Sequence, residues 1–251
     1  MHPIIFELGI IKLYSYGIMI ALGFLIATFF ASRAAIRDGL PSGKIADLCL
    51  YSLFFGILGA RLLHVSLDAQ YYLAKPIEIF LINHGGLAIQ GGLASGIAAA
   101  YVFIRVNKLP IWKTADLIAP YLALGQSIGR IGCLLNGCCY GKPTRLATGI
   151  YLPGHAFLLH PTQAYYSIAY LLVFIVLIAI YKKRKIYGLV FFSYLMMFSI
   201  IRFFLDYLRG DLYPVVLGLT SSQILAAVIA VTALTFLLKL FFSKSSGISG
   251  I

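Results

Sequence analysis

The chain has 251 residues, of which 61% are hydrophobic and only 11% are charged, and its net charge is +12. Soluble globular domains are about half apolar and about a quarter charged, so this composition excludes a soluble domain and indicates an integral membrane protein. The basic excess does not indicate a nucleic-acid partner, because Lys182, Lys183, Arg184 and Lys185 form one short cluster beside an apolar run, where such residues usually orient a helix.

Apolar runs of about twenty residues, the length that crosses a bilayer, recur along the sequence. We expect seven transmembrane helices, at residues 14–32, 46–67, 87–106, 114–135, 163–181, 188–208 and 217–242. The first run lacks a basic leader and is longer than a signal-peptide core, so we expect it to be retained. Residues 1–251 are thus predicted to form one all-α membrane domain, with residues 243–251 as a short disordered end.

The distribution of Lys and Arg between the loops predicts how the helices are oriented. The first, third and fifth loops and the C-terminal end are the more basic ones. Because cytoplasmic loops are enriched in these residues, we expect the N-terminus outside and the C-terminus in the cytoplasm. Arginines near the ends of the second, fourth and sixth helices then lie on the outer side.

The first three runs contain candidate residues with open alternatives. Tyr16 is either part of a site or an ordinary interfacial aromatic residue. Arg61 lies late in the second run, where a single arginine that extends to the interface is routine. Gln90 precedes Gly91 and Gly92, and these glycines fit close helix packing and close approach to a ligand equally well.

The run from Gly129 to Gly141 ends the fourth apolar segment and is the most informative part of the sequence. It places Arg130, Asn136 and four glycines at or near membrane depth, where polar residues are costly and usually functional. Arg130 keeps its charge and offers a planar fork of donors that suits a phosphate. We therefore expect a phospholipid head group as the ligand.

Arg202 and Asp206 add to this pattern in the sixth apolar run. Arg202, Asp206 and Arg209 are four and three residues apart, so they share one helix face and Asp206 can orient the arginines. Arg61, Arg130 and Arg202 together leave surplus positive charge within the membrane, which an anionic ligand would neutralise.

The histidine and cysteine residues near these segments allow several interpretations. His160, just before the fifth helix, either titrates near neutral pH or helps to cap the helix. Cys133, Cys138 and Cys139 lack the paired CxxC spacing of a metal site. We expect no metal and no cofactor, and we interpret the cysteines as packing variants whose replacement by serine leaves substantial activity.

Several blocks together resemble the bacterial prolipoprotein diacylglyceryl transferases, in an order and spacing that match across nearly the whole chain. They are Tyr16-Gly17, Gly59-Ala60-Arg61, Gly85-Gly86 with Gly91-Gly92, Asp116-Leu117-Ile118-Ala119-Pro120, the run from Gly129 to Gly141, His160-Pro161-Thr162-Gln163 and Arg202. The run from Gly129 to Gly141 is similar to the family signature GRxGxFxNGxxxG.

The resemblance implies a seven-span enzyme of the bacterial inner membrane, surrounded by membrane lipids. It would transfer the diacylglyceryl group of phosphatidylglycerol to the lipobox cysteine thiol in the signal peptide of a prolipoprotein, and release glycerol phosphate. The implied catalytic residues are Arg130, Arg202 and Tyr16. The implied substrate-binding residues are Arg61, Gln90, Gly91, Gly92, Asn136, Gly141, His160 and Asp206.

The sequence departs from this family at positions that affect the expected mechanism. Gln90 stands where many members have histidine, and an amide cannot act as a general base. Cys133 and Cys138 stand where asparagine and glutamate are common, Tyr166 where glutamate is common, and Asp206 for a usual glutamate. An electropositive pocket favours the acceptor thiolate by itself, so a dedicated base is dispensable in this hypothesis.

Three other functions remain open from the sequence. The chain could be a membrane thiol-redox protein that uses Cys138, Cys139 and Cys133. It could be a phospholipid-binding or transport protein that uses the arginine pocket without chemistry. It could also be a paralogue within the family that acts on a different acceptor.

Overall fold

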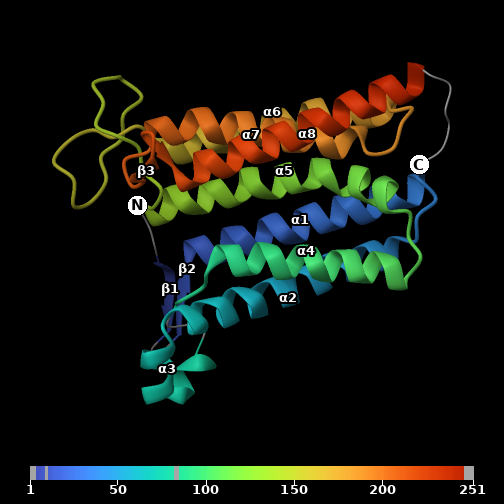
Figure 1. Ribbon diagram of the computed structural model, residues 1–251. Coiled ribbons are helices and arrows are strands. Elements are labelled where there is room, and N and C mark those ends of the chain that lie inside the picture. The colour runs from blue at the N-terminus through green and yellow to red at the C-terminus, as the bar shows by residue number, and fades with distance from the viewer. Residues whose placement is uncertain (1–3, 9–10, 82–84, 246–251) are drawn as a thin grey trace. The chain divides into compact units, whose positions relative to one another are not determined.

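The computed structural model describes residues 4–8, 11–81 and 85–245 (Figure 1). Seven helices in this part of the chain are long and apolar enough to cross a membrane. They are α1 (Ser15–Arg37), α2 (Ser42–Leu67), α4 (Ile89–Val106), α5 (Ile111–Asn136), α6 (Thr162–Lys183), α7 (Leu189–Leu205), which continues into η3 (Asp206–Leu208), and α8 (Ser221–Ser245). The predicted all-α membrane protein with seven spans is confirmed, and the orientation of its termini stays a prediction.

Several helix ends differ from the sequence prediction. Helix α2 begins at Ser42 instead of residue 46. Helix α8 begins at Ser221 instead of residue 217, because residues 214–216 and 219–220 form short strands. Helix α1 continues to Arg37 instead of ending at residue 32, since a basic side chain in the last turn interacts favourably with the helix dipole. Helix α8 includes residues 243–245, which we expected in the disordered end, and residues 246–251 lie outside the described residues.

Short elements connect the helices. They were not predicted from the sequence, because segments this short show no clear hydrophobic periodicity. They are β1 (Ile4–Leu8), β2 (Ile11–Tyr14), α3 (Ala69–Ala74), η1 (Pro76–Ile79), β3 (Pro214–Val216) and β4 (Leu219–Thr220). β1 pairs with β2, and β3 with β4, both antiparallel.

The chain divides into two compact units, which are described separately. One unit comprises Met1–Phe30 and Ala115–Ile251, and the other comprises Ala31–Thr114. The domain assignment over residues 1–251 stays a prediction.

In the unit Ala31–Thr114, helices α2 and α4 pack through glycines. A Cβ added at Gly59 would lie 2.9 Å from the carbonyl oxygen of Gly91, and one added at Gly92 would lie 3.2 Å from that of Gly56. The Ser95 hydroxyl donates across the contact to the carbonyl oxygen of Phe55 at 2.9 Å. Small residues let membrane helices approach this closely, so Gly91 and Gly92 have a packing role.

In the other unit, helices α1 and α5 also meet at glycines. A Cβ at Gly23 would lie 2.9 Å from the carbonyl oxygen of Gly125, and one at Gly132 would lie 3.3 Å from that of Tyr16. This close approach holds the start of α1 against the last turns of α5.

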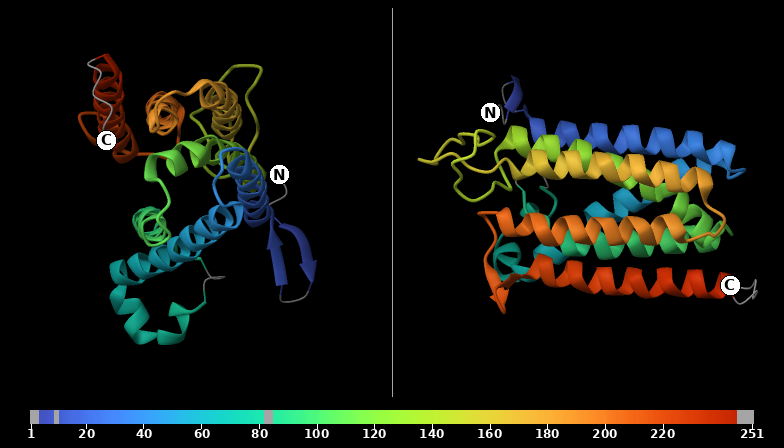
Figure 2. Two further views of the ribbon diagram at one scale, coloured as in Figure 1. Left: turned by 90° about the vertical axis from the view of Figure 1, so that its right-hand side faces the viewer. Right: turned by 90° about the horizontal axis from the view of Figure 1, so that it is seen from above.

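Helix α7 lies between α6 and α8 in the same unit (Figure 2). Its buried residues share an apolar core with α5 and α6, formed by Ala119, Ala123, Val173, Leu177, Val190 and Tyr194. Ser127 of α5 and Ser167 of α6 exchange hydrogen bonds, each hydroxyl donating to the other's carbonyl oxygen at 2.8 and 2.9 Å. These bonds fix the position of α5 against α6 near the predicted site.

Asp116 stabilises the start of α7. Its carboxylate accepts hydrogen bonds from the backbone N–H groups of Gly188 at 2.8 Å and Phe191 at 2.9 Å, and Arg184 lies 3.9 Å away. A carboxylate at a helix N-terminus satisfies N–H groups that have no partner within the helix.

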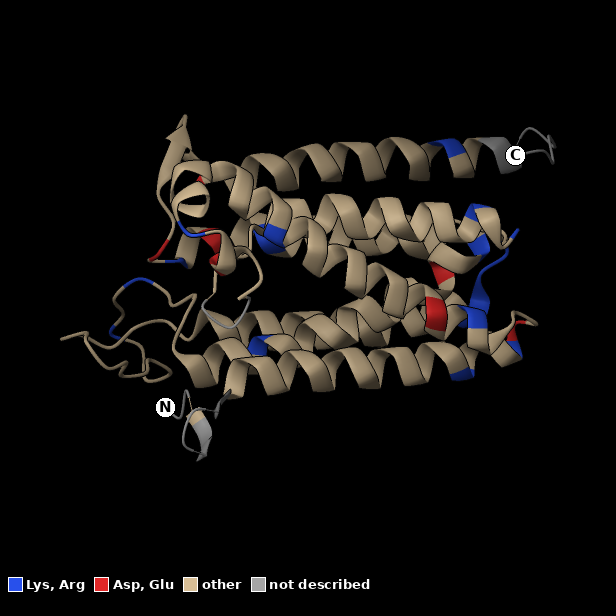
Figure 3. Ribbon diagram, turned by 90° about the horizontal axis from the view of Figure 1, so that it is seen from below, with Lys and Arg blue, Asp and Glu red and all other residues tan. Residues whose placement is uncertain are grey.

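The other charged residues lie mainly toward helix ends, where they can reach water, and only a few lie within the helices (Figure 3).

Candidate active site

The signature run begins in the last turns of α5 and leaves the helix through a Schellman turn. Gly137 has a left-handed backbone with φ of 75°. The N–H of Gly137 donates to the carbonyl oxygen of Leu134, and that of Cys138 donates to that of Cys133. This pair of bonds defines the motif, which favours glycine at the left-handed position and folds the chain back over the last helical turn.

The segment after this turn is held between the start of α6 and the end of α7. The N–H of Gly141 donates to His160 O at 3.0 Å, and the N–H of Lys142 donates to Leu208 O at 2.7 Å. Buried Thr162 and Gln163 donate to the carbonyl oxygens of Cys139 and Cys138, each at 2.7 Å. The run from Gly129 to Gly141 and the block from His160 to Gln163 are therefore joined by hydrogen bonds to backbone carbonyl oxygens.

Gly141 has no room for a side chain. An added Cβ would lie 2.5 Å from Cβ of His160, 2.6 Å from its carbonyl oxygen and 3.0 Å from that of Leu208. Contacts under 3.0 Å force the structure to shift. We predicted Gly141 as substrate-binding, and the structure gives it a packing position that supports the site.

Arg130 projects over an aromatic ring. Its guanidinium carbon lies 4.3 Å from the centre of the Tyr166 ring. Tyr166 is fully buried, stacks on Tyr170 with 5.8 Å between ring centres, and donates a hydrogen bond of 2.6 Å to Asp206. Arg130 has no ion pair among the described residues, so no carboxylate there neutralises its charge; it contacts the Tyr166 ring and also lies near the hydroxyl of Tyr170.

Asp206 lies where α6, α7 and α8 meet. Besides Tyr166, its carboxylate accepts a hydrogen bond from the hydroxyl of Ser222, and Arg202 and Arg209 each lie 3.7 Å away. The two arginines share one carboxylate, as their spacing predicted.

Arg209 is also held by a second carboxylate. It makes two hydrogen bonds to Asp211, at 2.9 and 2.6 Å. Burial by itself would lower the pKa of Arg209, but the hydrogen bonds and charge of Asp211 outweigh burial and raise this pKa above its ordinary value. Arg209 is therefore permanently charged and already paired, which leaves Arg202 as the arginine of this group that can bind a further anion.

Tyr170 lies close to both candidate phosphate-binding arginines. Its side chain is 1% exposed, and the charges of Arg130 and Arg202 both act on it. Its hydroxyl has no hydrogen-bond partner of normal geometry within the described residues. Buried hydroxyls normally have a partner. Arg130 is near enough to donate to the hydroxyl oxygen, so an oxygen-rich ligand between the arginines would supply the acceptor for the hydroxyl proton.

Tyr16 also belongs to this region. Its backbone contacts Gly132 of α5, and its hydroxyl is near enough to Arg130, Cys133, Cys138 and Cys139 to interact with them electrostatically. The side chain is 42% exposed. Tyr16 therefore combines an open position with proximity to the signature run.

His160 and Asn136 lie at the edge of the same unit. His160 has Nδ1 3.5 Å from the hydroxyl of Tyr165. Pro161 occupies the N-cap position of α6, and the carbonyl oxygen of His160 accepts a hydrogen bond of 2.8 Å from the N–H of Thr162. The side chain of His160 makes no capping bond there. Asn136 is exposed at the end of α5.

Arg61 lies in the other unit and binds backbone groups there. Its guanidinium donates to the carbonyl oxygens of Ile79 at 3.0 Å, Gly85 at 2.6 Å and Gly86 at 2.8 Å, and also to Glu78 and Leu81. With every nitrogen engaged, Arg61 organises the segment that precedes α4. It also lines a cavity of about 220 Å³ with Gly85, Gly86 and side chains of α2 and α3.

Gln90 is exposed in the first turn of α4.

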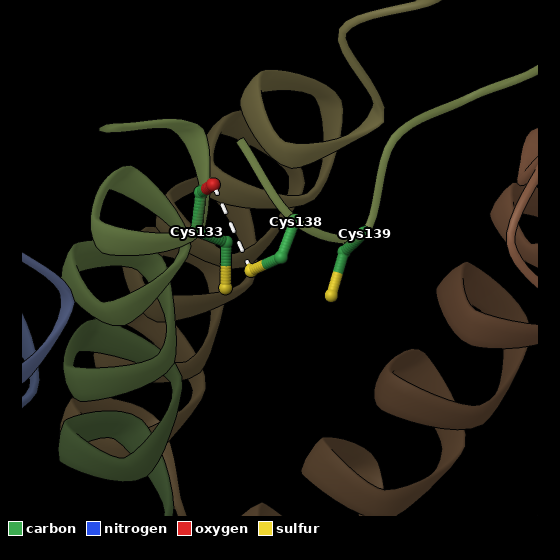
Figure 4. Close-up of side chains that lie close together, drawn as sticks. All are labelled: Cys133, Cys138 and Cys139. Atoms are coloured by element: carbon green, nitrogen blue, oxygen red, sulfur yellow. Dashed lines mark hydrogen bonds between the residues drawn. The ribbon is translucent and has the colours of Figure 1, made fainter. Parts of the chain in front are cut away.

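The three cysteines after Arg130 are clustered in space. Their sulfur atoms all lie within 4.8 Å of one another (Figure 4). Sγ of Cys138 lies 3.8 Å from the carbonyl oxygen of Cys133, a contact that is a hydrogen bond when Cys138 is protonated. Hydrogen bonds from the thiols of Cys133 and Cys139 lower the pKa of Cys138 well below its usual range. The spacing of the cysteines did not predict this cluster, because no CxxC loop forms it: the Schellman turn brings Cys138 to Cys133, and the left-handed backbone of Cys139 adds the third sulfur.

Several contributors to the site were not predicted from the sequence. Tyr170 and Ser222 carried no motif, and Thr162 and Gln163 were noted only as part of a block. Helical spacing could have indicated Tyr170, which is four residues after Tyr166 on the same face of α6. The Ser222 contact depends on how α8 packs, and no local pattern encodes it.

Comparisons with known proteins give a consistent result. The family model for prolipoprotein diacylglyceryl transferase matches residues 3–239. A phosphatidylglycerol–prolipoprotein diacylglyceryl transferase from Clostridium tetani is 35% identical over 231 residues, which cover 90% of this chain and 92% of the relative. One of the same description from Staphylococcus aureus is 34% identical over 247 residues, covering 94% and 88%.

Proposed function

Because the chain belongs to the prolipoprotein diacylglyceryl transferase family, we propose that Arg130 and Arg202 bind the phosphate of phosphatidylglycerol during transfer of its diacylglyceryl group to a prolipoprotein. The protein is a multi-pass membrane transferase. One observation supports the phosphate site most strongly: both arginines act on the buried hydroxyl of Tyr170, which has no partner of normal geometry among the described residues.

The charge around the site also supports an anionic ligand. Arg202 shares Asp206 with Arg209, and Arg130 contacts a ring in place of a carboxylate. A phosphate between Arg130 and Arg202 would balance the excess charge and would accept a hydrogen bond from Tyr170. Arginine forks suit this ligand because they donate two parallel hydrogen bonds.

The reaction displaces glycerol phosphate from a carbon of the diacylglyceryl group. The acceptor sulfur forms a bond to that carbon while the carbon–oxygen bond breaks, so negative charge accumulates on the departing phosphate. Cations already fixed at this position stabilise the transition state more than the ground state. Asp206 and Tyr166 hold the two arginines and do not take part in bond making.

The acceptor is the lipobox cysteine of the prolipoprotein signal peptide, and the membrane is the bacterial inner membrane. The basic end of α6 would face the cytoplasm, which puts the signature run at the outer side, where a secreted precursor arrives. Tyr16, partly exposed at the start of α1, lies where an acceptor peptide could reach the site. Gln90 is not the base, since an amide does not take up a proton near neutral pH.

A reconstituted assay tests this proposal. The full chain in phosphatidylglycerol liposomes, given a synthetic precursor peptide, should add one diacylglyceryl group per peptide and release equimolar glycerol phosphate. Arg130→Lys and Arg202→Lys keep the charge but lose the fork, so turnover should fall by about a hundredfold. Arg105→Lys, at the end of α4, is the matched control and should keep full turnover.

Two of the alternative functions, the lipid-binding or transport protein and the paralogue, predict different results in this assay. Lipid binding without release of glycerol phosphate would favour a binding or transport protein. Release of glycerol phosphate that requires a different acceptor would favour a paralogue within the family. In cells, complementation of a strain depleted of its own diacylglyceryl transferase, abolished by Arg130→Ala, would support the transferase.

A further inference from the structure

We propose that Cys133, Cys138 and Cys139 form a trithiolate site for a zinc-class divalent metal ion, with one coordination position left open for the acceptor thiol. The metal site itself stands on the geometry of the cysteines. The role of the open position rests on the proposed transferase function.

The distances between the sulfur atoms fit a single metal ion. Zinc binds thiolates at about 2.3 Å, which places tetrahedral sulfur ligands about 3.8 Å apart. The three sulfur atoms already lie within 4.8 Å of one another. Side-chain rotations alone can close the remaining difference, because the backbone already brings all three sulfurs to one place (Figure 4).

The turn after α5 explains only part of this arrangement. A Schellman motif commonly brings the residues at the positions of Cys133 and Cys138 into contact, so that pair alone would indicate packing. Cys139 lies outside the motif. Successive side chains of an extended chain point to opposite faces, whereas Cys138 and Cys139 both present their sulfur to Cys133, and Cys139 has a left-handed backbone with φ of 59°.

The surrounding structure holds this strained arrangement in place. Thr162 and Gln163, both fully buried, donate to the carbonyl oxygens of Cys139 and Cys138. A non-glycine residue in the left-handed region persists only where its surroundings fix it. The two consecutive cysteines are therefore preorganised, as ligands of a metal site need to be.

The ligand set corresponds to an open site. Structural zinc sites are closed by four protein ligands, whereas catalytic sites have three and leave the fourth position to water or substrate. Within the described residues, this group comprises the three cysteines alone. Cys138 and Cys139 are partly exposed, which gives a fourth ligand access.

The local charge tolerates such a site. Three thiolates and one divalent ion have a net charge of −1, and the charge of Arg209 acts on Cys139. Arg209 is also paired with Asp206 and Asp211, so it offsets only part of this negative charge.

This site would supply the activation that Gln90 cannot. The acceptor thiol binds the open position and loses its proton to solvent, because metal coordination deprotonates a thiol. Its sulfur then donates an electron pair to the glycerol carbon, and the carbon–oxygen bond breaks with its electron pair leaving on glycerol phosphate. The thioether product is a weak ligand and dissociates. The metal stays divalent throughout, so no oxidant or reductant is needed.

Metal stoichiometry and a cobalt spectrum test the site without any turnover. The full chain, purified in detergent, reduced and exposed to Zn²⁺ and then desalted, should retain one equivalent by elemental mass spectrometry. Co²⁺ in its place should give intense sulfur-to-cobalt charge-transfer absorption. Cys133→Ser, Cys138→Ser and Cys139→Ser should each weaken Zn²⁺ binding by more than about tenfold. Cys49→Ser, in α2 of the other unit, should change nothing.

Wild-type protein that keeps less than a tenth of an equivalent of Zn²⁺ would overturn the site. So would retention of full binding in the Cys139→Ser variant, or a stable disulfide between two of the cysteines under the same reducing conditions. A size-exclusion profile and circular dichroism spectrum like those of wild type establish that the variants are folded.

The role of the open position has its own test. A precursor peptide with its cysteine should shift the spectrum of the cobalt-loaded protein, and the same peptide with serine should not. Chelation that removes the metal should lower peptide transfer by more than about tenfold, with recovery on adding Zn²⁺. Unchanged turnover of the metal-free protein would refute thiol activation. Absence of turnover in both forms, with the cobalt shift present, would instead contradict the transferase proposal.

Discussion

The hydroxyl of Tyr166 donates a hydrogen bond of 2.6 Å to Asp206, while the ring of the same tyrosine carries the guanidinium of Arg130 at 4.3 Å. Asp206 in turn lies 3.7 Å from Arg202. One buried tyrosine thus connects an arginine of α5 with an arginine of α7. A change at Tyr166 can affect both sides of the proposed phosphate site.

Replacing Tyr166 by Phe should moderately lower both the stability and the turnover of the protein. The ring under Arg130 remains, but buried Asp206 loses one donor, so we expect the free energy of unfolding to fall by about 1–2 kcal/mol and turnover by about tenfold or less. Denaturation in detergent and the peptide-transfer assay measure the two effects. Tyr165→Phe is the control, because that neighbouring hydroxyl contacts Thr148 and His160 at the edge of the unit. Equal effects of both variants would contradict the special role of Tyr166.

Adding a methyl group at Gly141 should displace the backbone segment that follows α5 and thereby disrupt the site. In Gly141→Ala the new Cβ meets His160 and a carbonyl oxygen of Leu208, and overpacking of this kind costs about 1–3 kcal/mol. We expect a lower unfolding temperature together with lost turnover. Gly43→Ala in α2 meets nothing within 4 Å and should be neutral or slightly stabilising. A fully active, equally stable Gly141→Ala protein would show that the segment is not held as described.

Asp116 should matter for stability and not for chemistry. Asp116→Asn keeps one acceptor oxygen and replaces the other by an NH₂ group. One of the two N–H groups at the start of α7 therefore loses its acceptor, which should lower the free energy of unfolding by about 1–3 kcal/mol. The unfolding temperature should fall while turnover per folded molecule stays the same. Asp47→Asn, at an exposed position of α2, provides the comparison. A loss of turnover at unchanged stability would move Asp116 into the reaction.

The reactivity of Cys138 should depend weakly on pH. Its pKa is lowered, chiefly by hydrogen bonds from Cys133 and Cys139, so in the folded protein it is a thiolate at pH values where an ordinary thiol, with a pKa of about 8.5, is protonated. In reduced, metal-free protein, alkylation of Cys138 should be nearly constant from about pH 6 to about pH 8.

The denatured chain is the reference for this measurement. There the alkylation rate should rise by nearly tenfold per pH unit below the ordinary pKa of about 8.5. Peptide mapping of the alkylated sites separates Cys138 from the other cysteines. A folded-state rate that rises as steeply as in the denatured chain would show that no thiolate is stabilised.

The sequence predicts the helices well because membrane insertion depends on local properties. Length and hydropathy suffice to define a span, so all seven were found. The arginines at membrane depth were found for the same reason, since a charge there is conspicuous in any apolar run.

The partners of those arginines could not be predicted in this way. Arg61 and Arg130 look alike in sequence, but Arg61 donates to carbonyl oxygens 17 to 25 residues away, and Arg130 stacks on a ring in another helix. The cysteine cluster was missed because it depends on one left-handed glycine and on bonds from α6. Such relations arise from tertiary packing, which periodicity does not encode.

The backbone bonds at Gly141, Lys142 and His160 have a practical consequence for experiments on topology. The N–H of Gly141 donates to His160 O, and the N–H of His160 donates to Lys142 O, so these two bonds close residues 143–159 into a loop at its base. Lengthening a closed loop is inexpensive, at about 0.6 kcal/mol per doubling. An epitope or protease site inserted near exposed Gly154 should therefore report which side of the membrane this loop faces without disturbing the helices that carry it.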